Sequence, residues 1–160
     1  AFDDSGARFD GDGNVNNWWT EKDLKEFEKR GNALAEQYSA IEVMDSVFIN
    51  GKFTLGENIG DLGGVLGAYD GLQLFFEENG RPEDIDGFTA EQRFFMSWAT
   101  VWRTLTREDA LRTQIKTDPH SPGMQRATQP LKNIDYFYEA FGIKEGDEMW
   151  LAPEKRVRIW

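Results

Sequence analysis

One long glycine-rich segment constrains the fold of this chain more than any other feature. Residues from Thr54 to Glu78 have helical spacing, and Asn79-Gly80 is a typical helix stop. Thr54 and Glu57 form a capping-box pattern that would begin this helix. The interior glycines are Gly56, Gly60, Gly63, Gly64, Gly67 and Gly71. Each costs about 1 kcal/mol relative to alanine, so we expect another backbone to pack closely along the glycine face and offset the cost.

Caps and apolar periodicity predict four further helices. They cover residues 21–39 after a cap at Thr20, the segment from Thr89 to Leu105, the segment from Thr106 to Lys116, and the segment from Asn133 to Gly142. Residues 47–49 precede the turn signal Asn50-Gly51, so residues 52–54 would return as a short strand or form a loop. The pattern predicts a mainly α fold with few or no short strands, packed around the central glycine-rich helix.

Composition limits the partners of this chain. Its 160 residues suit one domain, and 39% hydrophobic residues with 14% aromatics suffice for a core. A net charge of -11 argues against nucleic acid and anionic membranes as partners. There is no cysteine, no signal-peptide pattern at the first residues, and no apolar run near the roughly 20 residues that span a bilayer. We therefore expect a soluble chain without disulfides or thiolate metal ligands.

Two carboxylates lie near the start of the central helix. Glu57 and Asp61 are four residues apart, so both would project from one helix face. Like charges this close are tolerated when they are solvated, or when a metal ion or imidazolium lies between them. Spacing alone favours the simpler alternative, in which Glu57 completes the capping box and Asp61 is a surface residue.

His120 is the only histidine in the chain. It stands in Asp118-Pro119-His120-Ser121-Pro122-Gly123, where two prolines and a glycine exclude a helix and predict a rigid loop. By itself, a lone histidine is more often a surface or satisfied core residue. A catalytic zinc site normally needs two or three imidazole or thiolate ligands, so this chain alone cannot complete one.

Motifs along the whole chain resemble the neprilysin family of zinc endopeptidases. The segment from Gly56 to Gly64 resembles its Glu-Asn-Ile-x-Asp-x-Gly-Gly signature. Other similar segments are Ala1-Phe2-Asp3-Asp4, which resembles the residues after its zinc-binding helix motif, the pair Trp18-Trp19, the loop Thr117 to Gly123 followed by Arg126, and the closing Arg156-Val157-Arg158-Ile159-Trp160. The resemblance implies that residues 1–160 are the C-terminal part of a single thermolysin-like (gluzincin) catalytic domain.

The resemblance also implies a metal site. Glu57 would be the third protein ligand of one zinc ion, bound through oxygen beside two imidazoles supplied from elsewhere. Asp61 and Asp3 would each accept the far N–H of one zinc-binding histidine. For Asp3, the residues alone favour an Asx turn at a helix end.

The remaining implied roles concern the substrate. His120 would donate a hydrogen bond to the oxyanion of the tetrahedral intermediate, and Asp118 is a candidate to orient it. Arg126 would bind a substrate backbone carbonyl on the leaving-group side, although a solvated cation is the alternative. Val101 and Trp102 would line the pocket for the residue after the scissile bond, with ordinary core packing as the alternative.

The function implied is zinc-dependent hydrolysis of peptide bonds in peptides. The family's His-Glu-x-x-His motif would stand directly before Ala1, so we expect the parent protein to be active and residues 1–160 alone to be inactive, without tight zinc binding. Partners would be peptide substrates and the remainder of the parent chain. The lack of cysteine favours a bacterial, cytoplasmic enzyme, with a parent that is exported without disulfides or anchored to a membrane as the alternatives. Two alternatives remain: a non-catalytic helical interaction domain on a peptidase-like scaffold, and a calcium-stabilised fragment.

Overall fold

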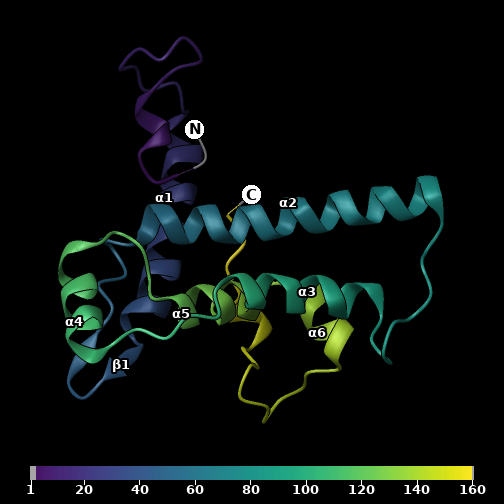
Figure 1. Ribbon diagram of the computed structural model, residues 1–160. Coiled ribbons are helices and arrows are strands. Elements are labelled where there is room, and N and C mark those ends of the chain that lie inside the picture. Colours follow the sequence, from purple (N-terminus) through teal and green to yellow (C-terminus); the bar gives the residue numbers. More distant parts are fainter. Residues whose placement is uncertain (1–2, 160) are drawn as a thin grey trace. The chain divides into compact units, whose positions relative to one another are not determined.

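The computed structural model describes residues 3–159, and most of its elements are helices (Figure 1). The helices are α1 (Glu21–Ser39), α2 (Leu55–Asn79), α3 (Ala90–Val101), α4 (Glu108–Thr117), α5 (Gly123–Thr128) and α6 (Asp135–Phe141). Shorter elements are the 3-10 turns η1 (Gly6–Arg8), η2 (Pro130–Asn133) and η3 (Pro153–Lys155), and an antiparallel hairpin of β1 (Glu42–Met44) with β2 (Val47–Phe48). The predicted mainly α fold is confirmed.

The chain divides into two units that share α2. The first unit holds Ala1–Gly63, Thr106–Pro122 and Val157–Trp160, and the second holds Gly64–Leu105 and Gly123–Arg156. The turns of α2 up to Gly63 therefore belong to the first unit, and its later turns belong to the second. The motif residues Ala1, Phe2 and Trp160 lie outside the described residues.

The hairpin in the first unit pairs β2 with a strand that precedes it. The strand predicted at residues 47–49 exists as β2, but its partner is β1. Asp45 and Ser46 join the two strands, and Ser46 adopts the left-handed conformation of a tight turn, with φ of 58°. The alternative of a returning strand at residues 52–54 is wrong, because these residues form the turn that leads into α2.

Gly51 packs against the C-terminal part of α1. Its N–H donates to Ser39 Oγ at 3.2 Å, and a Cβ at this position would collide with the carbonyl oxygen of Ala35. Glycine is required here by close approach and not by a hairpin turn. At the other end of α1 the predicted cap is confirmed, since Thr20 Oγ1 accepts from the N–H of Asp23 at 3.2 Å.

The start of α2 differs from the predicted capping box. Thr54 Oγ1 donates to the carbonyl of Asn50 at 3.2 Å and accepts from Asn58 Nδ2 at 2.9 Å. The reciprocal bond of the predicted capping box is wrong, because the backbone N–H of Thr54 donates to the carbonyl of Asn50 at 3.0 Å and not to the side chain of Glu57. The carboxylate of Glu57 instead lies beside the ring of His120.

The glycine face of α2 is more open than the sequence predicted. A Cβ at Gly56 would meet Asp4 Oδ1 at 2.7 Å, so a side chain of the N-terminal segment occupies that space. At four other positions, no described atom lies within 4 Å of a Cβ: Gly60, Gly64, Gly67 and Gly71. Within residues 3–159, the predicted close approach of another backbone to these four glycines is therefore wrong.

Aromatic rings form the core of the second unit. The ring of Tyr69 on α2 stacks on Phe95 of α3 and on Tyr136 of α6, at centroid distances of 5.5 and 4.7 Å. Phe137 meets Phe95 edge-on at 5.4 Å. In Figure 1, α3 accordingly runs beside the later turns of α2, and α3 also packs against α5 and α6. The predicted cap of α3 is confirmed, since Thr89 and Gln92 form a reciprocal capping box.

The N-caps of two helices differ from prediction. The N-cap of α4 is Arg107 and not Thr106, and the N-cap of α6 is Ile134; neither makes a side-chain cap bond. Asn133 instead donates from Nδ2 to the carbonyl of Gln129 at 3.3 Å. The stop of α6 at Gly142 is confirmed by its left-handed backbone, with φ of 64°.

The burial of α3 also differs from prediction. Apolar residues stand around much of the circumference of α3, which predicts a buried helix, but only Ala90, Glu91 and Phe95 are buried there, and Val101 is 67% exposed. Among residues 3–159, no helix combines the length and the apolar character that crossing a membrane requires.

Candidate functional site

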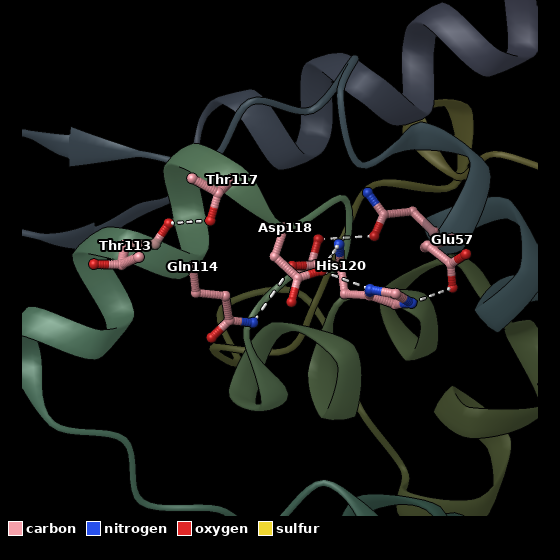
Figure 2. Close-up of polar contacts among 8 residues, drawn as sticks. Glu57, Thr113, Gln114, Thr117, Asp118 and His120 are labelled. Carbon is pink, nitrogen blue, oxygen red and sulfur yellow. Dashed lines mark hydrogen bonds and ion pairs between the residues drawn. The ribbon is translucent and has the colours of Figure 1, made fainter.

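The imidazole of His120 lies between two carboxylates in the first unit (Figure 2). Its Nδ1 is 2.6 Å from Asp118 Oδ1, and its Nε2 is 3.0 Å from Glu57 Oε2. Asp118 Oδ1 also accepts the backbone N–H of His120 at 3.0 Å. The side chains of His120 and Glu57 are 42% and 43% exposed, so both remain accessible to a ligand. The orienting contact expected from Asp118 is present.

The loop is positioned by the end of α4. The N–H of Asp118 donates to the carbonyl of Gln114 at 2.8 Å, which closes the last turn of the helix. Gln114 Nε2 reaches the carbonyl of His120 at 3.5 Å. Pro119 then prevents the helix from continuing, because proline lacks the N–H that another turn needs. The histidine is thereby fixed immediately after α4.

A buried polar chain joins the same loop to α2. Ser121 Oγ donates to Asn58 Oδ1 at 2.8 Å, and Asn58 Nδ2 donates to Thr54 Oγ1 at 2.9 Å. Asn58 and Ser121 are each 1% exposed. Leaving such a buried group unpaired costs about 1–3 kcal/mol, whereas an exposed ion pair contributes about 0–1 kcal/mol. The buried bond is therefore the stronger link between loop and helix.

The two other predicted acids differ in their surroundings. Asp61 lies one turn after Glu57 on α2 and is 6% exposed. Asp3 is exposed, and its Oδ1 accepts the N–H of Ser5 at 3.0 Å, which is the Asx turn favoured by the residues alone. Asp3 also lies near the start of α2, since its Cβ would be 3.8 Å from a Cβ at Gly56.

The donors present fit zinc as one part of a site. Glu57 offers an accessible carboxylate oxygen, a usual zinc ligand, beside an imidazole. Across residues 3–159, no group of three or more histidine, aspartate or glutamate side chains could hold a metal ion.

The predicted substrate residues lie in the second unit. The guanidinium carbon of Arg126 is 3.8 Å from the centroid of the Trp102 ring, and Trp98 Nε1 donates to the carbonyl of Arg126 at 3.1 Å. Val101 precedes Trp102 and is exposed. The structure thus brings Arg126 into contact with Trp102 in one unit, and Glu57 into contact with His120 in the other.

The second unit also contains a pocket of about 420 Å³ that the sequence did not indicate. Its lining includes Tyr69, Gln73, Arg81, Glu91 and Tyr136. The amide nitrogen of Gln73 is buried there without a hydrogen-bond partner among the described residues. None of the predicted site residues lines this pocket.

Sequence reasoning missed three residues that hold the His120 loop: Asn58, Ser121 and Gln114. Asn58 and Ser121 directly follow Glu57 and His120, so adjacency to candidate residues was an available signal. Their mutual contact was not available, because 63 positions separate them in the chain.

The chain is similar to known peptidases over its whole length. A model of peptidase family M13 matches residues 1–157. The neutral endopeptidase of Lactobacillus helveticus is 38% identical over 160 residues, and neprilysin-11 of Caenorhabditis elegans is 40% identical over 164 residues. Both alignments cover 100% of this chain but only 23% and 19% of those relatives. The chain therefore spans about a quarter or less of the length of the curated relatives it matches.

A solved structure agrees with the sequence comparisons. The crystal structure of Mycobacterium tuberculosis zinc metalloprotease ZMP1 in complex with inhibitor superimposes with a TM-score of 0.94 at 45% sequence identity. The match covers 99% of this chain and 25% of that one. The resemblance to the neprilysin family and the helical fold that it implied are thereby confirmed.

Proposed function

Because this chain belongs to peptidase family M13, we propose that its parent protein is a zinc-dependent metalloendopeptidase that hydrolyses peptide bonds of peptides. Residues 1–160 are the C-terminal part of its single catalytic domain. The observation that carries the proposal is the contact of 3.0 Å between Glu57 and His120, made within the two motifs that resemble the family. Two zinc-binding histidines and the general base are supplied by a His-Glu-x-x-His motif in the rest of the parent chain.

In this proposal, three carboxylates serve the metal site. Glu57 binds zinc through oxygen, and its exposure of 43% leaves the carboxylate accessible. Asp61 and Asp3 accept the far N–H groups of the two zinc-binding histidines and fix their tautomers. A bound zinc supplies Lewis-acid polarisation of the scissile carbonyl and lowers the pKa of water.

His120 donates a hydrogen bond from Nε2 to the oxyanion of the tetrahedral intermediate. Asp118 holds Nδ1 and the backbone N–H, so the ring already has the orientation that a donor needs where charge develops. Arg126 binds a backbone carbonyl of the peptide on the leaving-group side with its planar guanidinium. Val101 and Trp102 line the pocket for the residue after the scissile bond.

Substitution of Glu57 in the full-length parent protein tests this proposal. We expect Glu57→Gln to lower the bound zinc per chain and to reduce peptide hydrolysis by more than about a hundredfold, since even residues that only orient zinc ligands affect metal affinity 10–100-fold. Bound zinc is measured by elemental analysis and hydrolysis with a quenched fluorescent peptide. Glu77→Gln, an exposed carboxylate on the same helix, is the matched control.

Two results would contradict the proposal. Hydrolysis by the wild-type parent that resists a zinc chelator would exclude the metal. A parent chain without hydrolysis and without bound zinc would favour the non-catalytic interaction domain.

A further inference from the structure

We infer that Asn58 and Ser121 are positioning residues: the hydrogen bond between their side chains latches the His120 loop to α2 and fixes the imidazole of His120 relative to Glu57. The catalytic consequence of this latch rests on the proposed function. The latch itself is a structural claim, and it can be measured without any activity.

The latch joins the immediate neighbours of two site residues. Asn58 follows Glu57 on α2, and Ser121 follows His120 in the loop. Ser121 Oγ donates to Asn58 Oδ1 at 2.8 Å, while Glu57 Oε2 and His120 Nε2 lie 3.0 Å apart. Two parallel links therefore connect the same helix to the same loop.

Burial decides which link holds the loop. Asn58 and Ser121 are each 1% exposed, so water does not compete for their hydrogen bond. The side chains of Glu57 and His120 are more than two-fifths exposed, and water weakens their contact. The buried bond therefore sets the position of the loop, and the exposed pair follows it.

The amide of Asn58 is itself held in one orientation. Its Nδ2 donates to Thr54 Oγ1, and Thr54 is 4% exposed. With the NH2 group engaged there, the carbonyl oxygen must face Ser121, where it accepts the hydroxyl. The amide offers its donor and its acceptor at separate atoms, so the hydrogen bonds run in one direction, from Ser121 to Asn58 and from Asn58 to Thr54.

Hydrogen–deuterium exchange of the zinc-loaded, full-length parent protein tests the latch directly. In Ser121→Ala, we expect amides in residues 117–123 to exchange at least about tenfold faster, as for a local opening that has lost one buried hydrogen bond. Thr117→Val is the matched control: it also removes one hydroxyl, but from an exposed side chain that bonds only within α4. It should leave the exchange of residues 118–123 unchanged.

Kinetics of the same variants test the positioning role. We expect Ser121→Ala to lower kcat by about ten- to a hundredfold, the effect of misplacing a catalytic group, while bound zinc and KM stay close to wild type. Ser121→Cys keeps the shape of the side chain and weakens the bond, so its exchange and kcat should be intermediate. This variant keeps the test decisive if Ser121→Ala does not fold.

The outcomes separate the two proposals. If folded Ser121→Ala exchanges the amides of residues 117–123 at the wild-type rate, the latch does not hold the loop, whatever the activity of this variant. Faster exchange with wild-type kcat would overturn the positioning role. If the wild-type parent itself lacks zinc-dependent hydrolysis, the proposed function fails, and exchange still decides whether the latch exists.

Discussion

Some contacts of the His120 loop could be predicted from the sequence, and others could not. The contacts of His120 with Asp118 and Glu57 join residues already singled out by their motifs. The bond between Asn58 and Ser121 depends on α2 and the loop meeting in space, which no local pattern encodes. The capping pattern at Thr54 misled for a related reason, because the carboxylate of Glu57 lies beside the distant His120 and the backbone N–H of Thr54 bonds Asn50 instead.

Arg126 provides a prediction at the residue scale. Its guanidinium stacks on Trp102 at 3.8 Å, and a lysine could reproduce neither the stack nor a forked pair of hydrogen bonds. We expect Arg126→Lys in the full-length parent to raise KM about tenfold or more, since one hydrogen bond to a charged group contributes about 1.5–3 kcal/mol. Steady-state kinetics on a peptide substrate measure this change.

The control for Arg126→Lys is Arg103→Lys, an exposed arginine of the same unit. Equal effects of the two substitutions on KM would mean that the guanidinium of Arg126 makes no specific contribution, and the proposed contact with the substrate would be wrong.

At the scale of elements, helices with a clear period or stop signal were predictable, and the shortest elements were not. The helix at residues 21–39 and the end of α2 at Asn79 follow from periodicity and stop signals that extend over several turns. α5, η2 and β1 are too short to show a period, and tertiary contacts decide their existence. The openness of the glycine face was also beyond prediction, because spacing shows which residues share a face but not what covers it.

Two glycines give opposite predictions for the stability of the chain. A Cβ at Gly123 would lie 2.7 Å from Thr104 Oγ1 and 2.8 Å from the carbonyl oxygen of Trp102, so Gly123→Ala should destabilise by about 1–3 kcal/mol. Gly71 on α2 has open space, and Gly71→Ala should stabilise by up to about 1 kcal/mol through helix propensity. Urea denaturation of residues 1–160 measures both, and stabilisation by Gly123→Ala would contradict the packing at α5.

Glu91 at the start of α3 gives a pH-dependent prediction. Burial alone would raise its pKa, but hydrogen bonds from its own backbone N–H and from Arg81 outweigh burial and hold the pKa below the ordinary value of 4.5. A carboxyl whose pKa is lowered by folding stabilises the fold fully above its ordinary pKa, and this contribution is lost as pH falls through the lowered value. We expect Glu91→Gln to lower the free energy of unfolding by about 1.5–3 kcal/mol at neutral pH.

The difference between Glu91→Gln and wild type should shrink as the pH falls below 4.5, as measured by urea unfolding at a series of pH values. Glu78→Gln, an exposed carboxylate on α2, is the control and should show little difference at any pH. If the difference in unfolding free energy between Glu91→Gln and wild type stays constant at acidic pH, the charge of Glu91 does not contribute to stability.

For the whole molecule, we predict that residues 1–160 alone neither bind zinc tightly nor hydrolyse peptides. A catalytic zinc site needs three protein ligands, and the proposed site draws only Glu57 from this chain. Zinc titration by calorimetry and a peptide assay with and without chelator measure both properties. Chelator-sensitive hydrolysis by the isolated chain would show that the proposed division of ligands is wrong.

The loop that holds His120 has a thermodynamic consequence for the proposed reaction. Both ring nitrogens and the backbone N–H have partners before any peptide arrives. Immobilising a free side chain costs about 0.5–1.5 kcal/mol of rotamer entropy, and a ring already frozen by its own fold no longer incurs that loss at the transition state. The ring then keeps its orientation through Asp118, and only Nε2 has to exchange Glu57 for the oxyanion while charge accumulates.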